Sequence, residues 1–196
     1  MIAITLPDGS VKQFKSETTP MGVAHSISEG FARNVISASF NGKTIETSTP
    51  LTTDGELVLY TWRDKKGKEA FWHSSAHILA QALEDLYPNI KLTIGPAIEN
   101  GFYYDIDLVD NTISEKDLTT IENKMLEIAR GKHTFSIRES SKTDALGYYK
   151  KLGNQYKVEL IENLEEGTIT FCDHDNFTDL CRGGHIPHTG MVKAIK

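Results

Sequence analysis

The chain has 196 residues, of which 39% are hydrophobic, and it carries a formal net charge of −6. This length and apolar content suffice for one large or two small packed domains. The negative charge argues against a surface that wraps DNA along its whole extent, because phosphate binding depends on Lys and Arg. The amino terminus lacks a signal-peptide pattern and no segment is apolar over a membrane-spanning length, so we expect a cytoplasmic protein without a membrane partner. Cys172 and Cys181 are too few for a disulfide framework, and we expect thiols.

Residues 1–62 are predicted to form a small unit of strands around one helix. Ile2, Ile4 and Leu6 alternate as in a strand, and Thr19 followed by Pro20 is typical of a helix start. Further strands are predicted at 11–14, 37–40, 44–47 and 57–61. One helix across a mixed sheet is a β-grasp, ubiquitin-like pattern.

The polar stretch 63–69 has almost nothing to bury, so it is predicted to be a linker between two domains. A helix should then run from about Ala70 to Tyr87, closed by Pro88. This helix carries His73 and His77, which are four residues apart and therefore share a face.

Residues 70–196 are predicted to form a second, larger α+β domain. Ser114 and Asp117 resemble a capping box before a helix that ends at Gly131. Another helix should surround Ala145 and end at Gly153. Strands are predicted at 91–94, 101–107, 133–138, 156–161 and 168–172, the fourth of which bears Lys157.

Four metal-type side chains form two pairs about a hundred residues apart. His73 and His77 are the first pair, while Cys181 and His185 occupy a segment in which Gly183 and Gly184 allow the backbone to turn. Two histidines, a cysteine and a further histidine are chemically sufficient for tetrahedral zinc. The alternative is that each pair is structural, because half-buried histidines at helical spacing are common.

Five motifs follow one another along the chain. They are His73-Ser74-Ser75-Ala76-His77, Gly95-Pro96, Gly101-Phe102-Tyr103-Tyr104-Asp105, Tyr156-Lys157 and Asp179-Leu180-Cys181-Arg182-Gly183-Gly184-His185. Together with the β-grasp unit, they resemble the bacterial threonyl-tRNA synthetase family over essentially the whole chain. The resemblance implies a TGS domain at 1–62 and an editing domain of the threonyl/alanyl-tRNA synthetase type at 70–196, with its carboxyl-terminal boundary left open. Gly184 departs from the family, whose bacterial members usually carry proline there, which implies a more flexible loop.

The resemblance also implies an amino-terminal fragment. The family's class II aminoacylation domain, to which ATP and a zinc ion belong, and its anticodon-binding domain lie beyond the length seen here. We therefore expect this chain not to charge tRNA. We further expect it to be a monomer, whereas the full synthetase is expected to be a homodimer.

The function implied by the resemblance is post-transfer editing, in which the ester of seryl-tRNA(Thr) is hydrolysed to serine and free tRNA. Serine lacks one methyl group of threonine, and such a difference changes binding by only about 1 to 3 kcal/mol, so a second sieve is needed. The resemblance assigns catalysis to His73, as an anchor for water or the terminal ribose, and to Lys157, as a donor that activates water. It assigns substrate binding to His77, Tyr104, Asp179, Cys181 and His185.

Following the threonyl rather than the alanyl enzymes, we expect editing to need no metal or other cofactor. Zinc held by His73, His77, Cys181 and His185 stays the alternative that the spacing favours. The expected partner is the acceptor end of tRNA(Thr) carrying serine. Two rival functions are a non-catalytic tRNA- or nucleotide-binding module and a zinc-dependent hydrolase of aminoacyl esters.

Overall fold

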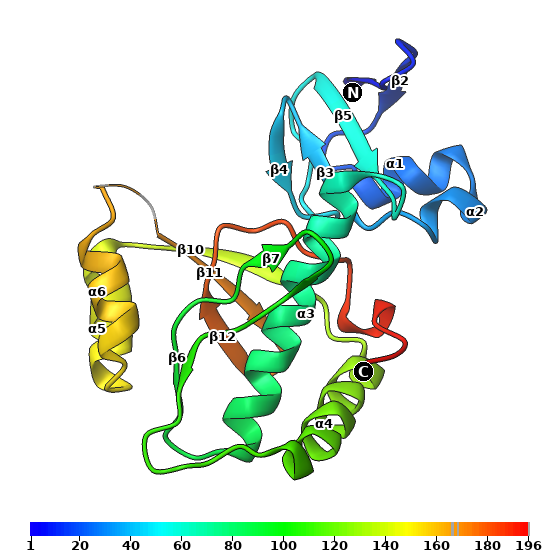
Figure 1. Ribbon diagram of the computed structural model, residues 1–196. Coiled ribbons are helices and arrows are strands. Elements are labelled where there is room, and N and C mark those ends of the chain that lie inside the picture. Colours follow the sequence, from blue (N-terminus) through cyan, green and yellow to red (C-terminus); the bar gives the residue numbers. More distant parts are fainter. Residues whose placement is uncertain (166, 168, 196) are drawn as a thin grey trace. The chain divides into compact units, whose positions relative to one another are not determined.

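The computed structural model describes residues 1–165, 167 and 169–195, which divide into two compact units (Figure 1). The first unit comprises Met1–Phe71 together with Gly183–Pro187. The second comprises Trp72–Arg182 and the residues from His188 onward. The segment 183–187 therefore groups with the amino-terminal part of the chain, although the sequence analysis placed it in the domain at 70–196.

The first unit is a five-stranded sheet with one longer and one shorter helix. The strand order is β2-β1-β5-β3-β4, in which β1 and β5 run parallel and the other neighbours run antiparallel. Its elements are β1 (Ile2–Thr5), β2 (Val11–Phe14), α1 (Pro20–Ile27), α2 (Glu29–Ala32), β3 (Ser37–Phe40), β4 (Lys43–Ile45) and β5 (Gly55–Tyr60). The predicted β-grasp is confirmed, whereas α2 was not predicted and β4 begins and ends earlier than the expected strand at 44–47.

Alternation and capping explain why these elements form. Ile2 and Ile4 of β1 point into a core that Val23 of α1 and Leu57 of β5 complete. The Thr19 side chain accepts a hydrogen bond of 3.0 Å from the backbone N–H of Gly22, as expected for a helix N-cap.

Helix α3 (Lys65–Leu86) begins five residues before the predicted start, so the prediction of a linker at 63–69 was wrong for most of that stretch. The Asp64 carboxylate accepts hydrogen bonds from the backbone N–H and the hydroxyl of Thr61, which closes a turn just before the helix. Gly67 then packs on this turn, where an added Cβ would lie 2.1 Å from the Thr61 carbonyl oxygen. The composition of the stretch therefore concealed a hydrogen-bonded turn at 61–64 from which the helix starts.

The described residues of the second unit form helices and three small antiparallel sheets, so the predicted α+β class is confirmed. The main sheet has the order β10-β11-β12, and the two-stranded sheets pair β6 with β9 and β7 with β8. Beside most of α3, its elements are β6 (Lys91–Leu92), β7 (Ala97–Ile98), β8 (Gly101–Phe102), β9 (Ile106–Asp107), η1 (Glu115–Asp117), α4 (Leu118–Gly131), β10 (Ser136–Ser140), α5 (Lys142–Lys151), α6 (Gln155–Glu162), β11 (Ile169–His174), β12 (Phe177–Leu180) and η2 (Thr189–Met191).

The prediction of a strand at 156–161 was wrong, because this segment forms α6, which packs against α5 (Figure 1). The Asn154 side chain caps the helix by accepting a hydrogen bond of 3.1 Å from the Lys157 backbone N–H. The buried positions are Lys157 and Ile161, four residues apart, which is the helical spacing. An apolar pattern this short is compatible with the period of a helix and with that of a strand, and the Asn154 cap favours the helix.

Other strands differ mainly in length. The expected strand at 101–107 is split into β8 and β9, which belong to different sheets, and the strand expected at 91–94 ends at Leu92. The capping box at Ser114 and Asp117 is confirmed. Thr168 of the strand expected at 168–172 and Lys196 of the expected editing domain lie outside the described residues. None of the described helices is both long enough and apolar enough to cross a membrane.

Candidate active site

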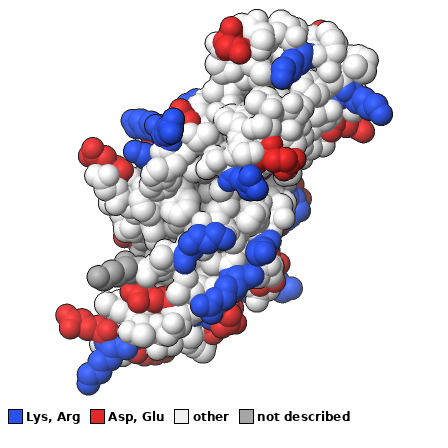
Figure 2. Space-filling model, turned by 90° about the vertical axis from the view of Figure 1, so that its right-hand side faces the viewer, with Lys and Arg blue, Asp and Glu red and all other residues white. Residues whose placement is uncertain are grey.

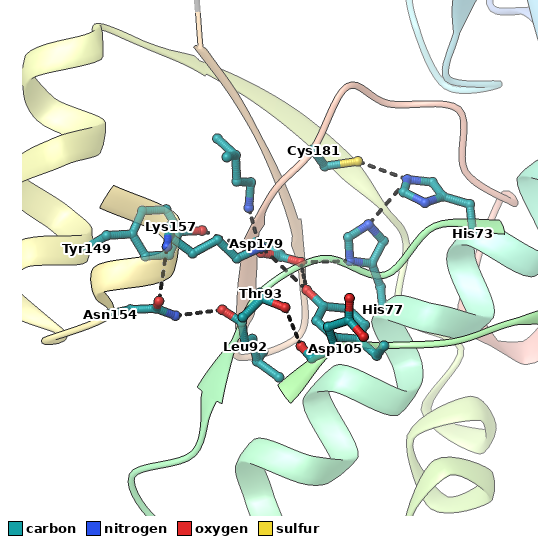
Figure 3. Close-up of polar contacts among 12 residues, drawn as sticks. His73, His77, Leu92, Thr93, Asp105, Tyr149, Asn154, Lys157, Asp179 and Cys181 are labelled. Carbon is teal, nitrogen blue, oxygen red and sulfur yellow. Dashed lines mark hydrogen bonds and ion pairs between the residues drawn. The ribbon is translucent and has the colours of Figure 1, made fainter. Parts of the chain in front are cut away.

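Two histidines of α3 meet a cysteine that follows β12. His73 and His77 lie one helical turn apart, and their Nε2 atoms are separated by 3.3 Å. Cys181 Sγ lies 3.0 Å from His73 Nε2 (Figure 3). Cys181 and Asp179 are buried and alternate with the partly exposed Thr178 and Leu180 at the end of the strand, so both side chains project to the same side of the sheet. Period-two alternation in one element and four-residue spacing in another thus bring these groups together.

Asp179 is the centre of the polar network that continues from His77. Its Oδ1 lies 2.6 Å from Lys157 Nζ, its Oδ2 lies 3.4 Å from His77 Nδ1, and it accepts a hydrogen bond from the Tyr104 hydroxyl. Burial opposes ionisation of this carboxyl, but the charge of Lys157 and the contact with His77 outweigh it and lower the pKa of Asp179. Asp179 is therefore an anion at all ordinary pH values.

The same contacts act on the neighbours of Asp179. Burial works against the imidazolium form of His77, but Cys181 and Asp179 together raise the pKa of this histidine above 6.5. Burial and the negative charge of Asp179 raise the pKa of the Tyr104 phenol well above 10.0. Tyr104 is consequently a neutral hydrogen-bond donor, and the contacts of His77 favour its imidazolium form.

The ammonium group of Lys157 is held from several sides. Its side chain is 3% exposed, and Nζ also lies 3.4 Å from the Tyr104 hydroxyl. The helix that carries it is anchored by Asn154, whose Nδ2 donates a 2.8 Å hydrogen bond to the Leu92 carbonyl (Figure 3). Lys157 is thus a fixed, buried cation and not the exposed lysine that its residue type alone would suggest.

Gly95 explains how Tyr104 reaches this network. An added Cβ at Gly95 would lie 2.2 Å from the Tyr104 ring, so only glycine permits the ring to pack there. The Gly95-Pro96 motif therefore shapes the wall on which Tyr104 lies.

A continuous path of contacts connects the two residues that were predicted to be catalytic. It runs from His73 to His77, from His77 to Asp179 and from Asp179 to Lys157, with no step longer than 3.4 Å. The structure therefore brings together six of the seven predicted site residues in the second unit, namely His73, His77, Tyr104, Lys157, Asp179 and Cys181.

The seventh predicted site residue, His185, belongs to the first unit, where Glu46 holds it. His185 Nδ1 lies 3.0 Å from Glu46 Oε1, and the imidazole is fully buried. Gly184 donates its backbone N–H to the same carboxylate at 2.9 Å and has a φ of 90°. The expectation of a more flexible loop at Gly184 is thus not what the contacts indicate, because the glycine is buried and hydrogen-bonded.

Lys157 and Asp179 also line a cavity of about 350 Å³, whose wall includes Glu84, Tyr149 and Asn154. Although the Glu84 residue is exposed, partial desolvation of its carboxyl group at the cavity wall, followed by the charge of Asp179, raises the pKa of Glu84 to about 7. A carboxyl group that titrates near neutrality beside a lysine–aspartate pair is typical of functional sites.

The donor set of the second unit also fits a metal ion by its chemistry. The ligand-type atoms of His73, His77 and Cys181 lie within 4.8 Å of one another, and imidazole nitrogen and thiolate sulfur are preferred ligands of zinc. Asp179 beside His77 Nδ1 would be the carboxylate that commonly orients a metal-bound histidine. Cys172 and Cys181 are buried and form no disulfide, as expected from their number.

Sequence reasoning missed several residues around this site. Asn154 carries a recognisable signal, because an asparagine that follows Gly153 and precedes a helix is a good N-cap. Tyr149 was not among the predicted site residues, although its hydroxyl lies 3.5 Å from Asp179 Oδ1. No local pattern marks Glu46, whose partner is 139 residues away.

Comparison with known proteins extends over the whole chain. Residues 2–61 match the TGS domain family, and residues 169–196 match the threonyl and alanyl tRNA synthetase second additional domain. The chain is 68% identical over 196 residues to a threonine–tRNA ligase of Flavobacterium johnsoniae and 65% identical to that of Flavobacterium psychrophilum. A threonine–tRNA ligase of Cytophaga hutchinsonii is 52% identical over the same 196 residues.

These alignments include 100% of this chain and 30% of the length of each relative. The chain therefore contains a region similar to TGS domains at 2–61 and one similar to the threonyl and alanyl tRNA synthetase second additional domain at 169–196, and along its whole length it is similar to a segment of threonine–tRNA ligases.

Proposed function

We propose that this chain hydrolyses the ester that joins serine to the 3′ end of tRNA(Thr). The observation that carries the proposal is the unbroken path of contacts from His73 through His77 and Asp179 to Lys157. It places the His73 imidazole and the fixed cation of Lys157 at the two ends of one network. The similarity to threonine–tRNA ligases supplies the substrate class.

Hydrolysis requires a positioned water and stabilisation of the negative charge that develops on the carbonyl oxygen. His73, which is partly exposed, binds the attacking water or the terminal ribose and accepts a proton. Lys157 donates to the oxyanion or to the water, and Asp179 holds it in place. The water oxygen bonds to the carbonyl carbon, the bond to the ribose oxygen breaks, and that oxygen takes up a proton. The products are serine and tRNA with a free hydroxyl group.

Selectivity against threonine is proposed to come from the surroundings of the serine side chain. Cys181 is 7% exposed and lies against His73, so an additional methyl group near this position would displace the substrate or the water. Exclusion by size at a second site compensates for the small difference in binding that one methyl group provides.

We propose that this reaction requires no metal. If zinc binds, His73, His77 and Cys181 would hold it, and zinc supplies activation of a bound water near neutral pH. Zinc-dependent hydrolysis is therefore the second candidate, and it is favoured by the donor set alone. A chelator distinguishes the two.

Binding of tRNA is proposed to be weak and to fall as salt rises. The net charge is −6, and Figure 2 shows basic side chains interspersed with acidic ones over one face of the molecule. Such a face offers only local attraction for phosphates.

The test is the rate at which the chain deacylates seryl-tRNA(Thr) and threonyl-tRNA(Thr), with and without a chelator. We expect faster hydrolysis of the seryl ester, resistance to the chelator, and loss of turnover in His73→Ala. His133→Ala is the matched control, because His133 is a partly exposed histidine of the same unit that pairs with Asp175 outside the network.

Each other result selects a different function. Loss of hydrolysis on chelation would favour the zinc-dependent reaction. Binding of tRNA without hydrolysis of either ester, by a folded sample, would leave a non-catalytic binding module. Equal rates for His73→Ala and the unsubstituted chain would remove His73 from the mechanism.

A further inference from the structure

One carboxylate of the TGS domain holds the segment 183–187 through three contacts. Glu46, which directly follows β4, accepts hydrogen bonds from the backbone N–H of Gly184 at 2.9 Å and of His185 at 3.3 Å. Its Oε1 also lies 3.0 Å from His185 Nδ1. The Glu46 residue is 7% exposed and His185 is 0% exposed, so water does not replace these contacts.

We infer that Glu46 is a positioning residue for His185, which it fixes in the tautomer that carries its proton on Nδ1. This inference rests on the proposed function and on the substrate-binding role that the family resemblance implies for His185. A carboxylate only accepts hydrogen bonds, so the ring nitrogen that faces it must be the donor. In the neutral ring, Nε2 is then the acceptor, so Glu46 determines which ring nitrogen donates and which accepts.

The backbone is shaped to receive this one anion. Gly183 and Gly184 have φ angles of 88° and 90°, a conformation that turns successive N–H groups toward a common point. An added Cβ at Gly184 would lie 3.0 Å from the side chain of Thr44, which belongs to β4 of the same unit. A side chain at this position would therefore disturb the approach of Glu46.

The contact between Glu46 and His185 Nδ1 distinguishes two roles for Glu46, which are orienting the imidazole and only attaching the segment 183–187. Two backbone N–H groups would suffice to attach the segment, and an amide oxygen could accept from them. Only the charge of a carboxylate also orients the imidazole strongly, as it does behind functional histidines in other proteins. Glu46→Gln retains an acceptor oxygen and removes this charge, so it discriminates between the two roles.

The first measurement does not depend on activity. Long-range proton–nitrogen NMR of the imidazole rings reports which nitrogen carries the proton, and His185→Gln assigns the His185 signals by their disappearance. We expect the Nδ1-protonated form in the unsubstituted chain and a shift toward a mixture of tautomers in Glu46→Gln. A proton on Nε2 alone in the unsubstituted chain would overturn the inference, whether or not any variant folds.

The second measurement is the hydrolysis of seryl-tRNA(Thr). We expect Glu46→Gln to lower kcat on the order of 10- to 100-fold, with little change in KM, the range typical for removing a carboxylate behind a functional histidine. Glu46→Asp should restore part of the rate. Glu56→Gln is the matched control, because Glu56 is an exposed glutamate of the same sheet.

The two measurements separate failure of the inference from failure of the proposed function. If the unsubstituted chain hydrolyses no ester, the proposed function fails, while the NMR result still decides the tautomer. If the chain hydrolyses the ester and a folded Glu46→Gln retains its rate, positioning by Glu46 is refuted. Circular dichroism establishes folding, and Glu46→Asp takes the place of a Glu46→Gln variant that does not fold.

Discussion

Lys157 Nζ lies 2.6 Å from Asp179 Oδ1, and the two side chains are only 3% and 4% exposed. A buried ion pair brings little net stability, because desolvation offsets the attraction. Removing one partner has a much larger effect, since the other charge is left buried and unpaired. The pair that is proposed to serve catalysis is therefore also a point at which the fold is vulnerable.

Lys157→Ala should accordingly destabilise the chain by about 3 to 5 kcal/mol. The free energy of unfolding from chemical denaturation measures the effect. Lys150→Ala is the control, because Lys150 pairs with Glu162 at 60% and 55% exposure, where a loss below about 1 kcal/mol is expected. Equal small losses for both variants would contradict burial of the Lys157–Asp179 pair. Because Lys157→Ala alters folding as well as charge, His73→Ala is the cleaner test of catalysis.

Asn154→Ala should affect both stability and turnover. It removes the cap of α6 and the hydrogen bond to the Leu92 carbonyl, so a loss of about 1 to 2 kcal/mol is expected. It should also lower kcat, since the backbone that presents Lys157 is less firmly held. Denaturation and deacylation assays on the same sample measure the two effects. Asn163→Ala, at the exposed carboxyl end of the same helix, should change neither.

Glu84→Gln should alter how stability depends on pH. The pKa of Glu84 is about 7 in the folded chain and near 4.5 when unperturbed, so the folded state retains its proton longer than the unfolded state. Stability is therefore lost as pH rises from about 4.5 to 7 and stays lower above this window. Thermal unfolding should show Glu84→Gln more stable than the unsubstituted chain at pH 8 and similar to it at pH 4.5.

The control for the loss of one carboxylate is Glu159→Gln, at an exposed position on α6. If Glu84→Gln raised the stability of the chain equally at pH 4.5 and pH 8, the amide would be acting through packing, and proton uptake would not be involved.

Two glycine substitutions should act in opposite directions. Gly184→Pro introduces the residue that the family resemblance implies at this position, but proline cannot adopt a φ of 90° and lacks the N–H that binds Glu46. A loss of more than about 1 kcal/mol is expected. Gly147→Ala lies within α5, where an added Cβ meets nothing within 4 Å, and should add about 0.5 to 1 kcal/mol. Denaturation midpoints test both, and a Gly184→Pro variant of unchanged stability would contradict the described loop.

Most of the helices and strands that were predicted correctly have a signal in their own sequence. The Thr19 cap, the capping box at Ser114 and alternation in β1 each act within a few residues, and all are present in the structure. The segment at 156–161 shows where this stops, because its apolar pattern fits either period and the deciding cap, Asn154, lies outside it.

Local sequence predicts one part of the candidate site and not the other. The spacing of His73 and His77 is a local property, so their shared face could be predicted. The burial of Lys157 depends on Asp179, which is on another element, and no pattern around Lys157 indicates it. The resemblance to a known family was therefore necessary to select Lys157, and only the structure identifies its counter-ion.

The chain passes between its two compact units three times, after Phe71, after Arg182 and after Pro187. Separately produced pieces comprising residues 1–71 and 72–196 would therefore not correspond to two complete folding units. The longer piece would contain the segment 183–187 without the carboxylate that it binds, and the shorter piece would contain Glu46 without its ligands. Mixing the pieces should then allow complementation, with the segment 183–187 acting as a peptide ligand of the TGS domain.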